Sequence, residues 1–190
     1  PLNNRAELHR ISADYAKALP LYERSLSIFE EFLGPEHSMV GVSIGNLAPL
    51  HQSMGGHAKA LPLYERSLMI YENLLGREHP VVAAIVIKLA ELYAIQGEHS
   101  KTLLLYRRGL RIASNAGATE GVWRAQNGLR VLFALLNQFD LAIFSGKQAV
   151  NTIQGMRARL TEMDRELQRS FLRNKEYVYR DLADLLISQG

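Results

Sequence analysis

The chain has 190 residues, of which 47% are hydrophobic, and its formal net charge is +3. Such values are ordinary for a folded chain that forms one domain or a short repeat array. The absence of cysteine excludes disulfides, thiolate zinc sites and cysteine nucleophiles. No apolar run approaches the length of about 18 residues that a membrane span needs. The N-terminal PLNNRAELHR lacks the apolar segment of a signal peptide, so we expect a cytoplasmic protein.

A half-unit opens the chain and recurs twice. Residues 3–15, NNRAELHRISADY, correspond to GNLAPLHQSMGGH at 45–57 and to IKLAELYAIQGEH at 87–99. A second segment follows each copy: AKALPLYERSL occurs at 16–26 and again at 58–68, and the looser SKTLLLYRRGL occurs at 100–110. The spacing is 42 residues throughout. A fixed period in this range is typical of stacked supersecondary units that cannot bury their apolar faces alone.

Each unit is predicted to contain two helices. In the copy at 58–68, small or apolar residues recur at helical spacing, as in Ala60, Tyr64 and Ser67. Gly55-Gly56 indicates the turn between the two helices, and Pro80 suits the first position of the next helix. Pro20 and Pro62 fall early in the second helix of their units, where each removes one backbone hydrogen bond.

The C-terminal part repeats less regularly. LRVLFALLNQFDLA at 129–142 still corresponds to LAELYAIQGEHSKT at 89–102, now 40 residues apart. Residues 138 to about 162 predict one long helix, and a second helix is expected to run from there to about 189. The apolar residues expected to be buried are Ala142, Ala149, Val150, Ile153, Met156 and Leu160 on the first helix, and Leu167, Phe171, Val178, Leu182 and Leu185 on the second.

Two interpretations of this C-terminal part remain open. A helical hairpin of such length would extend past its neighbours, so that Met163, Leu167 and Phe171 at its tip would contact a further domain or a second copy of the chain. One uninterrupted helix is the alternative, because Ile153 through Leu167 also fit a heptad spacing.

The repeat resembles the tetratricopeptide repeat (TPR), through the small–aromatic–small pattern of Ala60, Tyr64 and Ser67 and through Leu47 and Ala48 of the first helix. The 42-residue period and the connectors LGPEH and LGREHP are similar to those of kinesin-light-chain-like TPR proteins. The resemblance implies an all-α, right-handed superhelix of antiparallel helix pairs. It would comprise a TPR array at residues 1–136 and a longer helical hairpin at 137–190.

The resemblance also implies that the first helices line a concave groove that binds a protein or peptide. The groove positions carried over from the family are Asn3, Glu7 and Arg10, then Gly45, Pro49 and Gln52, then Ile87, Glu91 and Ala94. The places of the TPR carboxylate clamp hold Glu7, Pro49 and Glu91. A basic or apolar segment is therefore a better expected ligand than an acidic C-terminal peptide.

Residues 141–154 and 167–190 resemble the helical region that precedes the caspase-like CHAT domain in bacterial TPR–CHAT proteins. LADLLISQG at 182–190 also matches LAELYAIQG at 89–97, as though a partner helix should follow, and both ends of the chain cut through a repeat. We therefore expect a fragment of a longer protein. It would be either the regulatory region of a TPR–CHAT protease or, alternatively, a stand-alone peptide-binding adaptor of kinesin-light-chain type.

No catalytic set, metal site or cofactor is predicted. The Glu36-His37 and Glu78-His79 pairs recur at the repeat period, which favours helix-entry loops over convergent zinc ligands. Residues 1–99 carry 8 basic and 11 acidic residues, a net −3, whereas residues 100–190 carry 14 and 8, a net +6. Nucleic-acid binding is a weaker alternative for this basic half, since no nucleic-acid-binding motif accompanies its arginines at 107, 108, 111, 124 and 130 or Trp123.

Overall fold

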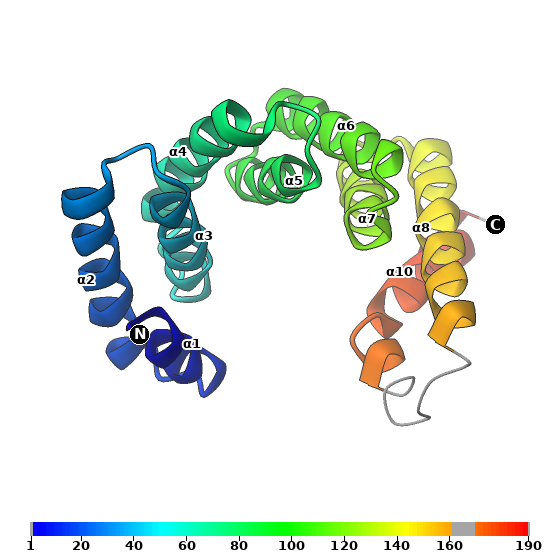
Figure 1. Ribbon diagram of the computed structural model, residues 1–190. Coiled ribbons are helices and arrows are strands. Elements are labelled where there is room, and N and C mark those ends of the chain that lie inside the picture. The colour runs from blue at the N-terminus through cyan, green and yellow to red at the C-terminus, as the bar shows by residue number, and fades with distance from the viewer. Residues whose placement is uncertain (1, 161–169, 190) are drawn as a thin grey trace. The chain divides into compact units, whose positions relative to one another are not determined.

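The computed structural model describes residues 2–160 and 170–189, and every regular element in those residues is a helix (Figure 1). The all-α prediction is confirmed. In chain order the helices are α1 (Leu2–Ile11), α2 (Tyr15–Leu33), α3 (Ser38–Ser53), α4 (His57–Leu75), α5 (Pro80–Ile95), α6 (His99–Asn115), α7 (Thr119–Leu135), α8 (Phe139–Leu160) and α10 (Glu176–Gln189). Residues 170–173 form a further short stretch of helix.

The helices form two compact units, one extending to Leu92 and the other beginning at Tyr93, so that the division falls near the end of α5. Each unit is described by itself. The division between a repeat array at 1–136 and a C-terminal hairpin at 137–190 stays a prediction.

In the first unit, α2 packs against both α1 and α3, and α3 packs against α4. Two apolar clusters hold these helices together. One contains Ala6, Ala18, Tyr22, Leu47 and Leu50, and the other contains Val40, Ile44 and Ile70. The predicted small–aromatic–small stripe of α4 is buried throughout, with Ala60, Tyr64 and Ser67 at most 3% exposed. Small side chains here let neighbouring helices approach closely, as the repeat pattern predicted.

The helices accommodate Pro20 and Pro62. Both prolines lie inside their helices and are exposed, and the helices continue to Leu33 and Leu75. Each proline lacks the amide hydrogen that would bond to the carbonyl four residues earlier. Because both prolines are exposed, the carbonyl that loses this hydrogen bond lies close to solvent.

The same left-handed turn recurs between helices. Gly55, where a turn was predicted, has a φ value of 76°, and Gly97 and Gly117 have φ values of 76° and 66°. Ala13 and Asn137 adopt the same conformation with φ values of 56° and 57°. The turn geometry is therefore kept even where the sequence supplies a residue with a side chain.

In the second unit, α7 packs against α6 and α8, and α10 packs against α8. The long helix predicted at 138–162 is confirmed as α8, with Ala142, Ala149 and Ile153 fully buried. Val178 and Leu182 of α10 are also buried, as predicted.

The prediction that the second C-terminal helix runs unbroken to 189 was wrong. A turn at residues 174–175 separates the short helix at 170–173 from α10. The Lys175 amide bonds to the Leu172 carbonyl at 2.9 Å, a tighter pattern than an α-helix has. Asn174 suits this break, because its short polar side chain favours turns over helix interiors.

One uninterrupted helix through this part of the chain was also a wrong alternative. Phe171 packs against a cluster formed by Trp123, Ala149, Ile153 and Val178. A straight helix would carry Phe171 about 27 Å along its axis from Ile153, at 1.5 Å per residue. Phe171 therefore does not continue along the axis of α8.

Replacing Ala60 with Leu tests the close packing of α4. Ala60 is fully buried, so we expect the larger side chain to lower the free energy of unfolding by about 1–3 kcal/mol through overpacking. Chemical denaturation followed by circular dichroism measures the loss. Ala58→Leu is the matched control, because Ala58 is exposed on the same helix. Equal stability of the two variants would contradict the packing.

Candidate functional site

The predicted groove residues lie on three first helices, at positions i, i+4 and i+7 of each. Asn3, Glu7 and Arg10 belong to α1; Gly45, Pro49 and Gln52 to α3; and Ile87, Glu91 and Ala94 to α5. All of them are half-buried except Ile87, which is only 2% exposed. A ligand on α5 would therefore meet Lys88 and Glu91 rather than Ile87. Binding at these residues stays a proposal.

A network on α1 and α2 fixes two of the groove residues. Arg10 donates from Nε to Glu7 Oε2 at 2.8 Å and from Nη2 to Oε1 at 2.6 Å. The Tyr22 hydroxyl, from the second helix, donates to Glu7 Oε2 at 2.6 Å. These bonds, that from Arg10 above all, lower the pKa of Glu7 to about 2, while burial and the Glu7 carboxylate raise the pKa of Tyr22. Glu7 is thus an ionised and fully engaged carboxylate.

Glu7 should make stability depend on pH in the acid range. Its pKa in the folded chain, about 2, is below the ordinary value of 4.5, so its stabilising effect is present above pH 4.5 and is lost as the pH falls toward 2. We expect Glu7→Gln to be less stable than the wild type at pH 7, with the difference shrinking as the pH falls through that window. Urea denaturation of both proteins at a series of pH values measures this. A difference that stays constant down to pH 2 would contradict it.

The second repeat holds its groove residue differently. The Tyr64 hydroxyl, one period after Tyr22, lies 3.4 Å from Oε1 of Gln52, a longer contact to a neutral amide. Gly45 leaves open space, because a methyl group added there would meet no atom within 4 Å. The predicted groove residues of α3 are therefore neutral, and Gly45 leaves space beside them.

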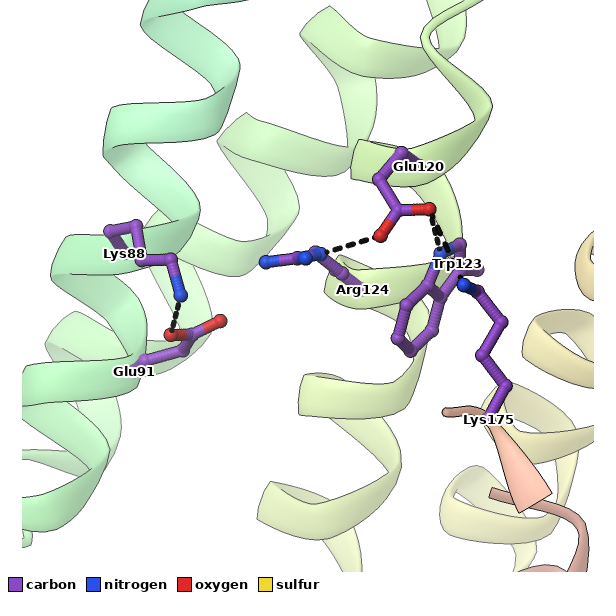
Figure 2. Close-up of polar contacts among 6 residues, drawn as sticks. All are labelled: Lys88, Glu91, Glu120, Trp123, Arg124 and Lys175. Carbon is purple, nitrogen blue, oxygen red and sulfur yellow. Dashed lines mark hydrogen bonds and ion pairs between the residues drawn. The ribbon is translucent and has the colours of Figure 1, made fainter. Parts of the chain in front are cut away.

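On α5, Lys88 donates to Glu91 at 2.7 Å, one turn apart (Figure 2). Both side chains are about 30% exposed, at 32% and 29%. Glu91 therefore does not present an unpaired carboxylate. The charges of Lys88 and Glu91 cancel, so this position offers no net positive charge that would attract an acidic ligand.

A pocket of about 430 Å³ in the first unit includes two of the predicted groove residues, Asn3 and Glu7. Asn3 donates to the Ser43 hydroxyl at 3.4 Å, and its own carbonyl oxygen is buried without a hydrogen-bond partner. The pocket is lined by Leu2, Asn3, Asn4, Glu7, Ser25, Phe29, Met39, Val42 and Asn46. It combines an apolar wall with several amide and hydroxyl groups, a composition that suits an extended peptide.

A polar cluster that was not predicted lies on α7 in the second unit. Glu120 accepts from Trp123 Nε1 at 2.8 Å and from Arg124 Nε at 3.0 Å (Figure 2). The ammonium of Lys175 lies 3.8 Å from Glu120, 5.1 Å from the centroid of the Trp123 ring and 4.0 Å from that of Phe171. Burial opposes the charged form of Glu120, but these donors outweigh it and lower its pKa.

Sequence alone could have located part of this cluster. The 40-residue offset that aligns 129–142 with 89–102 also extends back along α7, where it aligns Asn127 with the groove position Ile87. In this alignment α7 is the first helix of a repeat. Glu120 and Arg124 lie one turn apart on it, in the turns before Asn127. Lys175 gave no such signal, because it belongs to the turn at residues 174–175, which the sequence pattern does not indicate.

The Glu-His connectors serve as helix-entry loops, as predicted. His37 accepts from the Met39 amide through Nδ1 at 3.1 Å, and His79 accepts from the Val81 amide at 3.2 Å. These bonds cap the first amides of α3 and α5, where helix ends lack internal partners. Among residues 2–160 and 170–189, no cluster of three or more His, Asp or Glu side chains suits a metal ion.

Of the predicted tip residues, Met163 and Leu167 lie outside the described residues. Phe171 is half-buried against the Trp123 cluster. Its predicted role in binding a further domain or a second copy stays a prediction.

The arginines do not form one open basic surface. Arg130 is 6% exposed and donates to Asp181 and Asn127, each at 2.9 Å. Arg124 is engaged with Glu120. At least two of the five arginines considered for nucleic acid thus have structural partners.

This arrangement of paired helices with small residues at their crossings defines a helical-repeat protein. The tetratricopeptide repeat family matches residues 1–72 and 41–115. The chain therefore belongs to the tetratricopeptide repeat family. No curated protein matches the sequence. No helix among the described residues is long and apolar enough to cross a membrane.

Solved structures with similar folds are kinesin-light-chain-like. BtubC (BKLC) from P. vanneervenii matches with a TM-score of 0.75 at 21% identity, over 82% of this chain and 63% of its own length. A kinesin-light-chain candidate from Podosopora anserina, with nearly identical TPR-like repeats, matches with a TM-score of 0.64 at 20% identity, over 97% and 90%. A variant of that protein with a single substitution gives 0.64 at 19%, over 98% and 90%. This chain thus spans less than two thirds of BtubC.

Proposed function

We propose that this TPR chain is an adaptor that binds an extended peptide segment of a partner protein along the first helices of its repeats. Tetratricopeptide repeats are protein-interaction scaffolds, and the similar solved structures are kinesin-light-chain-like. The observation that carries the proposal is the pocket of about 430 Å³ that includes Asn3 and Glu7, two residues predicted to contact a ligand.

The chemistry of the pocket favours an apolar or basic segment. Leu2, Phe29, Met39 and Val42 supply apolar surface, and Met39 and Val42 are 37% and 39% exposed. None of the residues that line the pocket is a cation, so the pocket offers no positive charge to attract a carboxylate. A peptide could bury an apolar side chain in the pocket. The amide groups that flank this side chain would then hydrogen-bond to the asparagine side chains.

Selection of displayed peptides against the full chain tests the proposal. We expect enriched sequences to contain apolar residues with few acidic ones, and to lose binding to the variant Val42→Asp. Met69→Asp is the matched control, because Met69 is 60% exposed on α4 and does not line the pocket. Selected peptides that bind both variants equally would show that the pocket is not the binding site.

The regulatory region of a TPR–CHAT protein is a finer form of the same proposal. It requires a caspase-like histidine and cysteine downstream in the same reading frame, which sequencing of the gene beyond Gly190 tests. The similar solved structures favour the adaptor form. Cytoplasmic location, lack of enzymatic activity and self-association stay predictions.

A further inference from the structure

The second helices of the first unit end in exposed apolar pairs. Phe32 and Leu33 end α2, and Leu74 and Leu75 end α4 one 42-residue period later. Phe32 is 75% exposed, and Leu33 and Leu75 are each 44% exposed. Further helices of the array precede and follow both α2 and α4. The exposure therefore belongs to the repeat and does not arise at an end of the chain.

Negative charge flanks the apolar pair of α2. Glu31 comes directly before this pair and Glu36 follows it in the connector, and both are exposed. Arg77, in the connector after α4, is paired with Glu72 at 3.8 Å. We call this surface the acidic edge, and it consists of Glu31, Phe32, Leu33, Glu36, Leu74 and Leu75.

The second helices of the second unit carry a different exposed pattern. Leu104 on α6 and Phe144 on α8 are 68% and 60% exposed. Arg107 and Lys147 follow them by one turn and are also exposed, and the 40-residue offset of this part of the chain makes the two pairs equivalent. Leu104 lies about 200° around α6 from Tyr106, the residue that packs against Gly128 of α7. We call this outward surface the basic face, and it consists of Leu104, Arg107, Phe144 and Lys147.

Each surface is confined to one unit. The places of Leu104 and Arg107 hold proline and glutamate in both earlier repeats, at 20 and 23 and at 62 and 65. Conversely, the apolar end pair of α2 and α4 is replaced by Ala116 and Gly117 after α6. The sequence of α6 contains no acidic residue, and that of α8 contains Asp140 alone. The acidic edge and the basic face are thus opposite in charge, and both have exposed apolar groups.

We propose that the acidic edge of one copy of this chain binds the basic face of a second copy. The apolar pairs of the edge pack against Leu104 and Phe144, and the two carboxylates of the edge pair with Arg107 and Lys147. Both surfaces place their apolar groups on successive second helices, one repeat apart, so both apolar contacts can form together. A second copy is the occupant that the sequence itself supports, because it supplies the surface of opposite charge.

The proposed contact is head-to-tail, since the edge and the face lie on different units. Neither surface includes a residue that lines the peptide pocket. A failure of peptide binding at the pocket therefore does not decide whether two copies associate, and the reverse also holds.

Sedimentation velocity of the full chain over a range of concentrations tests the proposal. We expect association that increases with concentration and weakens in about 0.5 M salt, because salt screens exposed charges. An edge variant, Glu31→Lys/Glu36→Lys, and a face variant, Arg107→Glu/Lys147→Glu, should each need at least about tenfold more protein to associate, because like charges then meet. An equimolar mixture of the two variants should associate again, since it combines an unaltered edge with an unaltered face.

The matched control is Arg5→Glu/Lys59→Glu, which changes the net charge as the face variant does, at exposed positions outside both surfaces. It should associate as the wild type does. Phe144→Ser should weaken association in low and high salt alike, because salt does not screen an apolar contact. Circular dichroism checks that each variant is folded.

Three results would overturn the proposal. The wild type could remain monomeric at about 0.3 mM in low salt. The edge and face variants could associate as the control does. A mixture of the two variants that does not recover association would exclude the pairing of edge with face.

Discussion

Gly128→Ala should strongly destabilise the second unit. A methyl group at Gly128 of α7 would lie under 3.0 Å from three atoms of the Tyr106 side chain on α6. Tyr106 is 5% exposed, so its ring has little room to move. We expect a loss of about 3 kcal/mol in the free energy of unfolding, the upper part of the usual overpacking range. Denaturant unfolding followed by circular dichroism measures it.

Two variants separate this clash from the general effect of alanine in a helix. Gly155→Ala places the same methyl group on α8, where no atom of the described residues lies within 4 Å. It should be neutral or stabilising by up to about 1 kcal/mol, as alanine favours helices over glycine. Tyr106→Ala removes the ring, so adding Gly128→Ala to it should have little further effect. If Gly128→Ala were strongly destabilising in the Tyr106→Ala variant as well, a clash with the Tyr106 ring would not be the cause.

Trp123→Ala should release the C-terminal helix. Trp123 is 5% exposed and packs with Ala149 and Ile153 of α8 and Val178 of α10. Removing it leaves a cavity between three elements and takes a hydrogen bond and a cation–π contact away from Glu120 and Lys175. We expect a loss of about 3–5 kcal/mol. Hydrogen exchange should rise first in residues 170–189.

Trp123→Phe provides the comparison. Phenylalanine keeps an apolar ring beneath Lys175 but cannot donate to Glu120, so the loss should be well below that of alanine. Trp123 is the only tryptophan of the chain, so its fluorescence follows unfolding in the wild type but not in these variants. If exchange in residues 170–189 were unchanged by Trp123→Ala, the cluster would not be what holds α10 in place.

The repeat period made most of the fold predictable. Residues that recur every 42 positions share an environment, so Ala60, Tyr64 and Ser67 could be assigned to a helix crossing before any coordinates were known. The glycine turns followed for the same reason, because only a few residues tolerate a left-handed turn. The long helix α8 was predictable from the spacing of Ala142, Ala149 and Ile153, although its repeat had become irregular.

The features that could not be predicted depend on contacts between distant residues. The turn before Lys175 brings that ammonium over Trp123, 52 positions earlier in the sequence, and no local pattern encodes such a contact. Burial of Ile87 was missed because a position carried over from a family specifies a face of a helix, whereas accessibility depends on the neighbours.

The two identical stretches at 16–26 and 58–68 have a consequence for how this chain can evolve. Tyr22 and Tyr64 occupy equivalent places, yet one hydroxyl donates to an ionised carboxylate and the other faces a neutral amide. The eleven residues around each tyrosine are identical, so the difference arises from the first helices, which supply the acceptors Glu7 and Gln52. Mutations in the first helices can therefore change what a repeat recognises without disturbing the packing that the second helices maintain. Each duplication would copy a tested scaffold and leave half of every new unit free to acquire a different specificity.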